Sequence, residues 1–213
     1  MDSFLANFAV TVLDLVIIIP IFLFAMIIHE IAHGWVAYKL GDPTAKFSGR
    51  LTLNPVSHID PIGTILLPIT LMIMGSPVVF GWAKPVPINF MGLRNPKKDI
   101  AWVGAAGPLA NVMLAFALVA AYRLFPFLHE PLLKGLMFYA ISINLILAAF
   151  NLIPIPPLDG SRILFSFLPP RMAMSYMSIE PYGFMILFVM LWMGFLNWFV
   201  NPILFALSRI IGF

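Results

Sequence analysis

The residues with the clearest chemistry are two histidines and a glutamate in the stretch HEIAH, residues 29–33, which follows a long apolar run. His29 and His33 are four residues apart, so a helix would place both on one face. Two imidazoles at this spacing can bind one metal ion, and Glu30 can act as general base toward a water molecule that the metal activates. There are two alternatives: either the motif arose by chance, or its polar side chains are hydrogen-bonded to neighbouring residues without any metal. Because burying these groups in hydrocarbon is costly, we expect metal binding.

Two histidines leave a zinc site one protein ligand short. The best third candidate is Asp159, in the stretch NLIPIPPLDG at residues 151–160. Its three prolines cannot continue the preceding helix, so the chain there can reach the depth of the histidines against protein or a water-filled cavity. The alternative is that Asp159 caps a following helix.

Three asparagines lie in apolar segments near these residues. Asn111 ends the small-residue stretch GAAGPLAN and could bond a substrate backbone or a developing oxyanion, or form an interhelical packing bond. Asn151 is interpreted as orienting the Asp159 loop, with a role in substrate binding left open. Asn144 shares a helix face with Asn151 and is interpreted as a contact that holds helices together.

His58, in the stretch NPVSHIDPIG, has three possible roles: a fourth metal ligand, a partner of a ligand, or a solvated loop histidine. A catalytic zinc needs an open position for water, which argues against a fourth protein ligand. We therefore favour the solvated loop histidine.

Composition defines the class of protein. Of 213 residues, 62% are hydrophobic and only 10% are charged, whereas soluble domains have roughly a quarter charged residues. We expect one all-α polytopic membrane domain, residues 1–213, in the lipid bilayer of the cell membrane, with no nucleic-acid partner. Cysteine is absent, which excludes disulfides.

The apolar runs predict about four to five transmembrane helices. Their expected bounds are 4–40, 99–125, 132–152 and 182–211, the last with a break at Pro202. The short stretch 61–77, punctuated by proline and glycine, predicts a re-entrant element or a short extra span. Residues 45–54 alternate like a strand, so we also expect a β-hairpin or a strand edge there that could pair with an unwound substrate.

Basic residues predict the orientation in the membrane. By the positive-inside rule, both flanks of 61–77 are cytoplasmic. Those flanks and the later cytoplasmic loops carry Lys39, Lys46, Arg50, Lys84, Arg94, Lys97, Lys98, Arg162 and Arg171, which leaves only Arg123, Lys134 and Arg209 outside. Since His33 precedes Lys39 by six residues, the site should lie nearer the cytoplasmic face.

The three motifs HEIAH, GAAGPLAN and NLIPIPPLDG, in this order, resemble the site-2 protease family of intramembrane zinc metalloproteases. The stretch GRLTLNPVSHIDPIG looks like a short prokaryotic subgroup without a PDZ or CBS module. The resemblance implies one Zn²⁺ per chain held by His29, His33 and Asp159, with Glu30 as catalytic base. It implies regulated intramembrane proteolysis: hydrolysis of a peptide bond within or near a transmembrane segment of a membrane-protein substrate, expected to be single-pass.

The competing hypothesis from another class is a metal-ion transporter or sensor with a His/Asp site in the membrane. A transporter would favour ligands at several depths along a path and would not need Glu30 as a base. Only one cluster of possible metal ligands is evident in the sequence, which favours catalysis over metal transport.

Overall fold

The computed structural model describes residues 2–74 and 81–211, and every regular element within those ranges is helical. Within these two ranges, four segments are long and apolar enough to cross a membrane: Ile17–Lys39 within α1 (Asp2–Lys39), α4 (Pro96–Leu124), α5 (Pro131–Asn151) and Pro170–Met190. This confirms the prediction of an all-α polytopic membrane protein.

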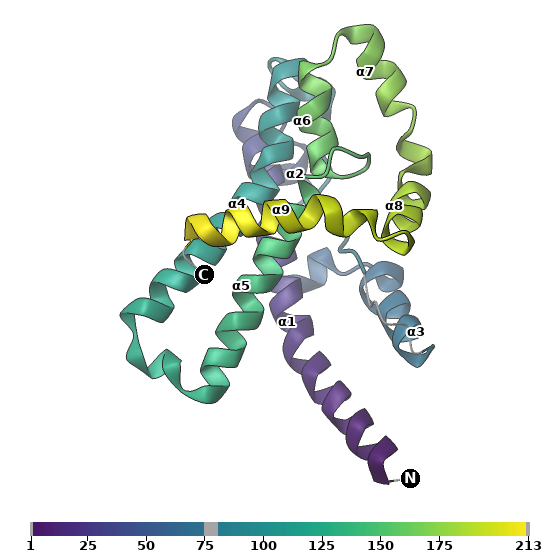
Figure 1. The fold of residues 1–213 in the computed structure, drawn as a ribbon. Coiled ribbons are helices and arrows are strands. Elements are labelled where there is room, and N and C mark those ends of the chain that lie inside the picture. The colour runs from purple at the N-terminus through teal and green to yellow at the C-terminus, as the bar shows by residue number, and fades with distance from the viewer. Residues whose placement is uncertain (1, 75–80, 212–213) are drawn as a thin grey trace.

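Helices α1, α4 and α5 form the central group, in which α4 and α5 are joined by a short turn, η4 (Pro126–His129), and pack against α1 (Figure 1). Proline is the first residue of both α4 and α5, where its missing N–H costs nothing. At the start of α4 the Asp99 carboxylate accepts a hydrogen bond from the Asn95 N–H at 2.8 Å. These starting residues explain why α4 begins three residues before the predicted position.

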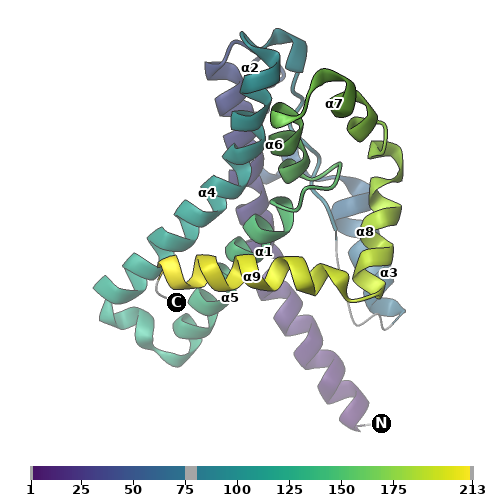
Figure 2. The ribbon, with the colours of Figure 1, turned by 45° about the horizontal axis from the view of Figure 1, so that its top comes forward.

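The C-terminal part is divided into α6 (Asp159–Phe167), α7 (Pro170–Met177), η5 (Glu180–Tyr182), α8 (Gly183–Trp192) and α9 (Phe195–Ile211). The predicted break at Pro202 is wrong, because Pro202 lies inside α9 and the chain turns at Gly194 instead. Gly194 has a φ of +76°, a left-handed conformation that glycine adopts without steric cost. Helix α9 then runs across the α4–α5 hairpin (Figures 1 and 2).

The predicted strand at 45–54 and the β-hairpin are also wrong for the described residues, which contain no strand. Residues Thr44–Phe47 form a short helix, α2, and residues 48–54 are irregular. The cause is local: the Asp42 carboxylate accepts from the Thr44 N–H at 3.0 Å and from its hydroxyl, which favours a turn over an extended chain.

The stretch 61–77 begins with a π-helical segment, η2 (Pro61–Leu66), which continues into α3 (Leu67–Ile73). Residues 75–77 lie outside the described part of the chain. The two segments have 6 and 7 residues, which gives a length of at most roughly 20 Å, shorter than a ~30 Å hydrocarbon core. This helical piece is therefore too short to cross a bilayer by itself.

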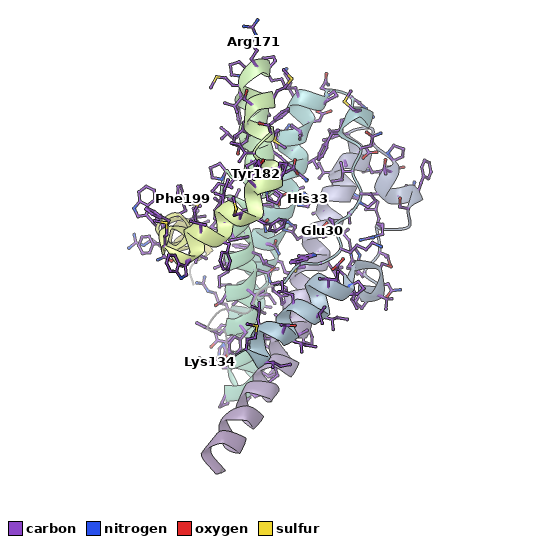
Figure 3. The ribbon with its side chains drawn as sticks, turned by 90° about the vertical axis from the view of Figure 1, so that its right-hand side faces the viewer. Glu30, His33, Lys134, Arg171, Tyr182 and Phe199 are labelled. Carbon is purple, nitrogen blue, oxygen red and sulfur yellow. The ribbon has the colours of Figure 1, made fainter. Side chains whose placement is uncertain are left out.

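Two further elements complete the region between α1 and α4: the single turns η1 (Pro55–His58) and η3 (Phe90–Gly92). Between α3 and η3, residues 81–89 run without helical structure past the C-terminal half of α1, and we call them the 81–89 segment. Figure 3 places Arg171 and Lys134 at opposite ends of the helix group, with Glu30 and His33 between them.

Candidate metal centre

Helix α1 presents His29 and His33 toward α4, and both imidazoles are buried, with 7% and 4% of each residue exposed. Their Nε2 atoms lie 3.0 Å apart. The i, i+4 spacing therefore has the effect expected from the sequence, since it brings two ring nitrogens of one helix face to a common point.

Asp159 completes this group from the other side. After α5 ends, a proline-rich turn leads to Asp159, the first residue of α6, which is 6% exposed. Its Oδ2 lies 3.0 Å from His29 Nε2 and 3.1 Å from His33 Nε2. The alternative role as a helix cap is not seen, because no side chain caps the N-terminus of α6. In the described ranges, these three residues are the one group that could hold a metal ion.

The second nitrogen of each imidazole shows where its proton resides. His33 Nδ1 is 2.6 Å from the carbonyl oxygen of Val103, which can only accept, so His33 Nδ1 carries the proton and donates it. Neutral His33 then has its lone pair on Nε2, facing Asp159.

His29 is fixed in the same way by a side chain. Its Nδ1 lies 2.6 Å from Asn111 Oδ1. The Asn111 amide nitrogen donates to the Ala25 carbonyl at 3.1 Å and to Asn144 Oδ1 at 2.8 Å, so the atom that faces His29 must be the accepting oxygen. His29 therefore donates from Nδ1 and keeps its lone pair on Nε2.

When both rings are neutral, the buried cluster presents two nitrogen lone pairs and a carboxylate oxygen to one another, 3.0 to 3.1 Å apart. Lone pairs this close repel one another unless a proton or a metal cation lies among them. Two imidazoles and one carboxylate are a ligand set that suits zinc, and hydrogen bonds to the outer nitrogens are typical of zinc-binding histidines. The residues present therefore fit a zinc ion.

Gly107 on α4 lies directly against the imidazoles. A Cβ atom at this position would come within 2.5 Å of His29 Nε2 and closer still to His33 Nε2. Only glycine allows the α4 backbone to approach the cluster this closely, which explains one of the small residues in the stretch GAAGPLAN.

Glu30 follows His29 on α1 and is partly buried. Its Oε2 accepts a hydrogen bond from the Val86 N–H at 2.7 Å, so the 81–89 segment holds the carboxylate. Three further backbone N–H groups anchor this segment: Trp82 to the Gly63 carbonyl at 3.1 Å, Lys84 to the His58 carbonyl at 2.8 Å, and Asn89 to Asp42 Oδ2 at 2.7 Å.

The other histidine and asparagine of the sequence analysis lie elsewhere. His58 is fully buried and donates from Nε2 to the Thr52 carbonyl at 2.8 Å, so the favoured solvated role is wrong. It is not part of the metal group formed by the described residues. The Asn151 amide nitrogen donates to the Leu147 carbonyl of its own helix at 3.0 Å.

Two contributors to the site were not found from the sequence. The Val103 carbonyl is a backbone atom, which leaves no trace in residue types. The Val86 N–H belongs to a segment without helical or alternating pattern. A signal did exist for Asn144, since a buried polar residue in a transmembrane helix requires a partner, but the sequence did not identify that partner as Asn111.

The fold and the site together define a polytopic membrane protein with a buried His–His–Asp group that could hold a metal ion. Residues 126–194 match the family model for Peptidase family M50. No solved structure matches the chain significantly.

Curated relatives match most of the chain. It is 38% identical over 200 residues to "Putative zinc metalloprotease YwhC" of Bacillus subtilis, covering 89% of this chain and 85% of that protein. It is 32% identical over 187 residues to "Putative zinc metalloprotease Rip2" of Mycolicibacterium smegmatis, covering 86% and 70%. A protein of the same name from Mycobacterium tuberculosis is 32% identical over 199 residues, covering 92% and 75%.

The chain therefore belongs to peptidase family M50, the site-2 protease family of zinc metalloproteases. This confirms the resemblance seen in its three motifs, together with the expectation of a zinc-dependent hydrolase in a membrane.

Proposed function

We propose that this protein hydrolyses a peptide bond within or near a transmembrane segment of another membrane protein, in regulated intramembrane proteolysis. In this proposal His29, His33 and Asp159 hold one zinc ion and Glu30 is the general base. The observation that carries it is the convergence of three possible ligand atoms: two from the histidines of a helix segment long enough to span a bilayer, and one from Asp159 at the start of α6.

Each residue has a distinct task in this reaction. When bound, zinc polarises the scissile carbonyl and lowers the pKa of water to about 7. Glu30 takes the proton of the attacking water and later delivers it to the leaving amine. The Val86 N–H, bonded to one oxygen of Glu30, fixes the direction of the carboxylate. The burial of His29, His33 and Asp159 keeps bulk water away from the ligands.

Asn111 and Asn151 are both predicted to bind substrate, but their hydrogen bonds favour different roles. Both N–H groups of Asn111 are taken by Ala25 and Asn144, which favours support of His29 over contact with a substrate. For Asn151, we keep the proposal of a role beside the Asp159 loop, where it could contact substrate, because it is the last residue of α5.

The placement in the membrane follows from length and charge. We propose that helices η2 and α3 form a re-entrant element, because they are too short to span and basic residues stand on both sides of them. Lys39 lies six residues beyond His33, roughly 9 Å along α1, so the site would be nearer the cytoplasmic face. The substrate would be a single-pass protein, and the chain one domain.

Cleavage of single-pass substrates by the purified, zinc-loaded protein tests the proposal. Glu30→Gln should abolish cleavage while zinc stays bound, because glutamine cannot accept the proton. Glu130→Gln is the matched control, since Glu130 is exposed at the turn between α4 and α5. Cleavage by Glu30→Gln would refute the role as base, and loss of zinc would make Glu30 a ligand. Metal transport into vesicles without cleavage would favour the transporter.

A further inference from the structure

Asn144 is a buried polar residue on α5 whose side chain bonds to Asn111 and to the Ala140 carbonyl. Only 2% of it is exposed. Its amide nitrogen donates to the Ala140 carbonyl of its own helix at 2.8 Å. Because that carbonyl can only accept, the other atom of the amide, Oδ1, is the one that faces Asn111.

A directed chain of hydrogen bonds thus begins on α5, passes through α4 and ends on α1. Asn144 Oδ1 accepts from the Asn111 amide nitrogen at 2.8 Å, and Asn111 Oδ1 accepts from His29 Nδ1 at 2.6 Å. Each bond has only one possible direction once the bond to Ala140 is given. The proton on His29 is therefore placed on Nδ1 by a residue two hydrogen bonds away.

We propose that Asn144 is a positioning residue of the metal centre: by holding the amide of Asn111, it determines which nitrogen of His29 is free to bind the metal. The inference rests on the proposed function, because it takes His29 as a metal ligand. It gives α5 a direct part in metal binding, although α5 itself contributes no ligand.

The second acceptor for Asn111, the Ala25 carbonyl, cannot replace Asn144 fully. Ala25 is four residues before His29, so its oxygen also serves the backbone hydrogen bond of α1, and its distance to Asn111 is longer, 3.1 Å. Without Asn144, the usual orientation of Asn111 leaves one buried N–H without an acceptor. The reversed orientation turns an N–H toward His29, which favours a proton on Nε2, the nitrogen that must bind the metal.

Three variants of Asn144 separate these effects. Asn144→Leu keeps the approximate volume but removes the acceptor. Asn144→Ser also removes the acceptor but keeps a polar side chain. The serine side chain is too short to reach Asn111, and its hydroxyl bonds back to its own helix. Asn144→Asp is the conservative rescue, since an oxygen faces Asn111 whether the carboxyl is neutral or ionised. Ile141→Ala controls for packing, because Ile141 is buried in the same α4–α5 interface without a hydrogen-bonding side chain.

Two measurements on the full chain in detergent micelles test the proposal without any substrate. Competition with a chelator gives the zinc dissociation constant. The ¹⁵N shifts of the imidazole nitrogens in metal-free protein labelled at its four histidines report which nitrogen of His29 carries the proton. We expect Asn144→Leu and Asn144→Ser to bind zinc about 10-fold more weakly or worse, and to show His29 partly protonated on Nε2.

Asn144→Asp and Ile141→Ala should keep the His29 proton on Nδ1 and bind zinc within about threefold of the unchanged protein, which is below the usual effect of losing a ligand's partner. The proposal is overturned if Asn144→Leu and Asn144→Ser bind zinc as tightly as the unchanged protein. It is equally overturned if Ile141→Ala weakens zinc binding as much as they do, or if Asn144→Asp does not restore it. Because neither readout involves peptide cleavage, failure of the proteolysis proposal would appear separately.

Discussion

Replacement of Gly107 by alanine is the most direct physical test of where the two imidazoles lie. In the structure, a Cβ on residue 107 would stand within 2.5 Å of both Cε1 and Nε2 of His29. Ordinary contacts between carbon and other heavy atoms begin at about 3.5 Å, so the helix or the imidazole must move by roughly 1 Å.

A shift of that size is large for a metal site, where ligand distances are held to about 0.2 Å. Closely packed interiors do not absorb it by small adjustments. We therefore expect Gly107→Ala to weaken zinc binding at least about 100-fold, the upper end of what loss of a ligand's support causes. Alanine has a higher helix propensity than glycine, by about 1 kcal/mol, so α4 itself should remain intact.

The assay is chelator competition on the purified protein, with circular dichroism to confirm helix content. Gly135→Ala is the matched control, because a Cβ at residue 135 of α5 meets nothing within 4 Å. Gly104→Ala is an intermediate case, since its Cβ would lie 3.0 Å from the backbone carbonyl oxygen of Asp159 and 3.0 Å from Arg162 Cβ. The expected order of zinc affinity is Gly135→Ala, then Gly104→Ala, then Gly107→Ala.

Normal zinc affinity in Gly107→Ala would refute the packing of α4 against the histidines, and with it the geometry of the cluster. A loss that appears equally in Gly135→Ala would attribute the effect to helix stiffness instead of contact with the imidazoles.

Three other predictions concern the ligands, the base and the metal. Asp159→Asn should lose zinc in chelator competition, because a neutral amide replaces the one anionic ligand; stoichiometric zinc in this variant would exclude Asp159 as a ligand. Val86→Pro removes the N–H that donates a hydrogen bond to Glu30, and should lower cleavage roughly 100-fold with zinc content unchanged, as expected for a misdirected base. Unaltered cleavage would show that this hydrogen bond is dispensable. Removal of zinc should lower the thermal unfolding midpoint, because metal at 1,000 times its Kd stabilises the folded state by about 4 kcal/mol; an unchanged midpoint would mean that the ion does not stabilise the fold.

Features that depend on interactions between residues close in the sequence are predictable from it, whereas features that depend on distant segments are less so. The pairing of His29 with His33 depends on helix geometry alone, and their approach to Asp159 follows from the direction in which each helix runs. The alternation of residues 45–54 predicts a strand, but a turn at Asp42 decides the local structure. His58 is held by the Thr52 carbonyl and by the Lys84 N–H of the 81–89 segment, and no pattern in the sequence specifies these two contacts.

The bond between Glu30 and the 81–89 segment has a consequence for how activity should be measured. The proposed ligands are carried by α1 and α6. The orientation of the proposed base, Glu30, depends instead on the 81–89 segment, which is anchored to the Gly63 and His58 carbonyls and to the Asp42 carboxylate. Metal loading and turnover are therefore separable properties of the molecule. A preparation can be fully zinc-saturated and yet inactive if that segment is displaced, so metal content alone is no measure of the active fraction.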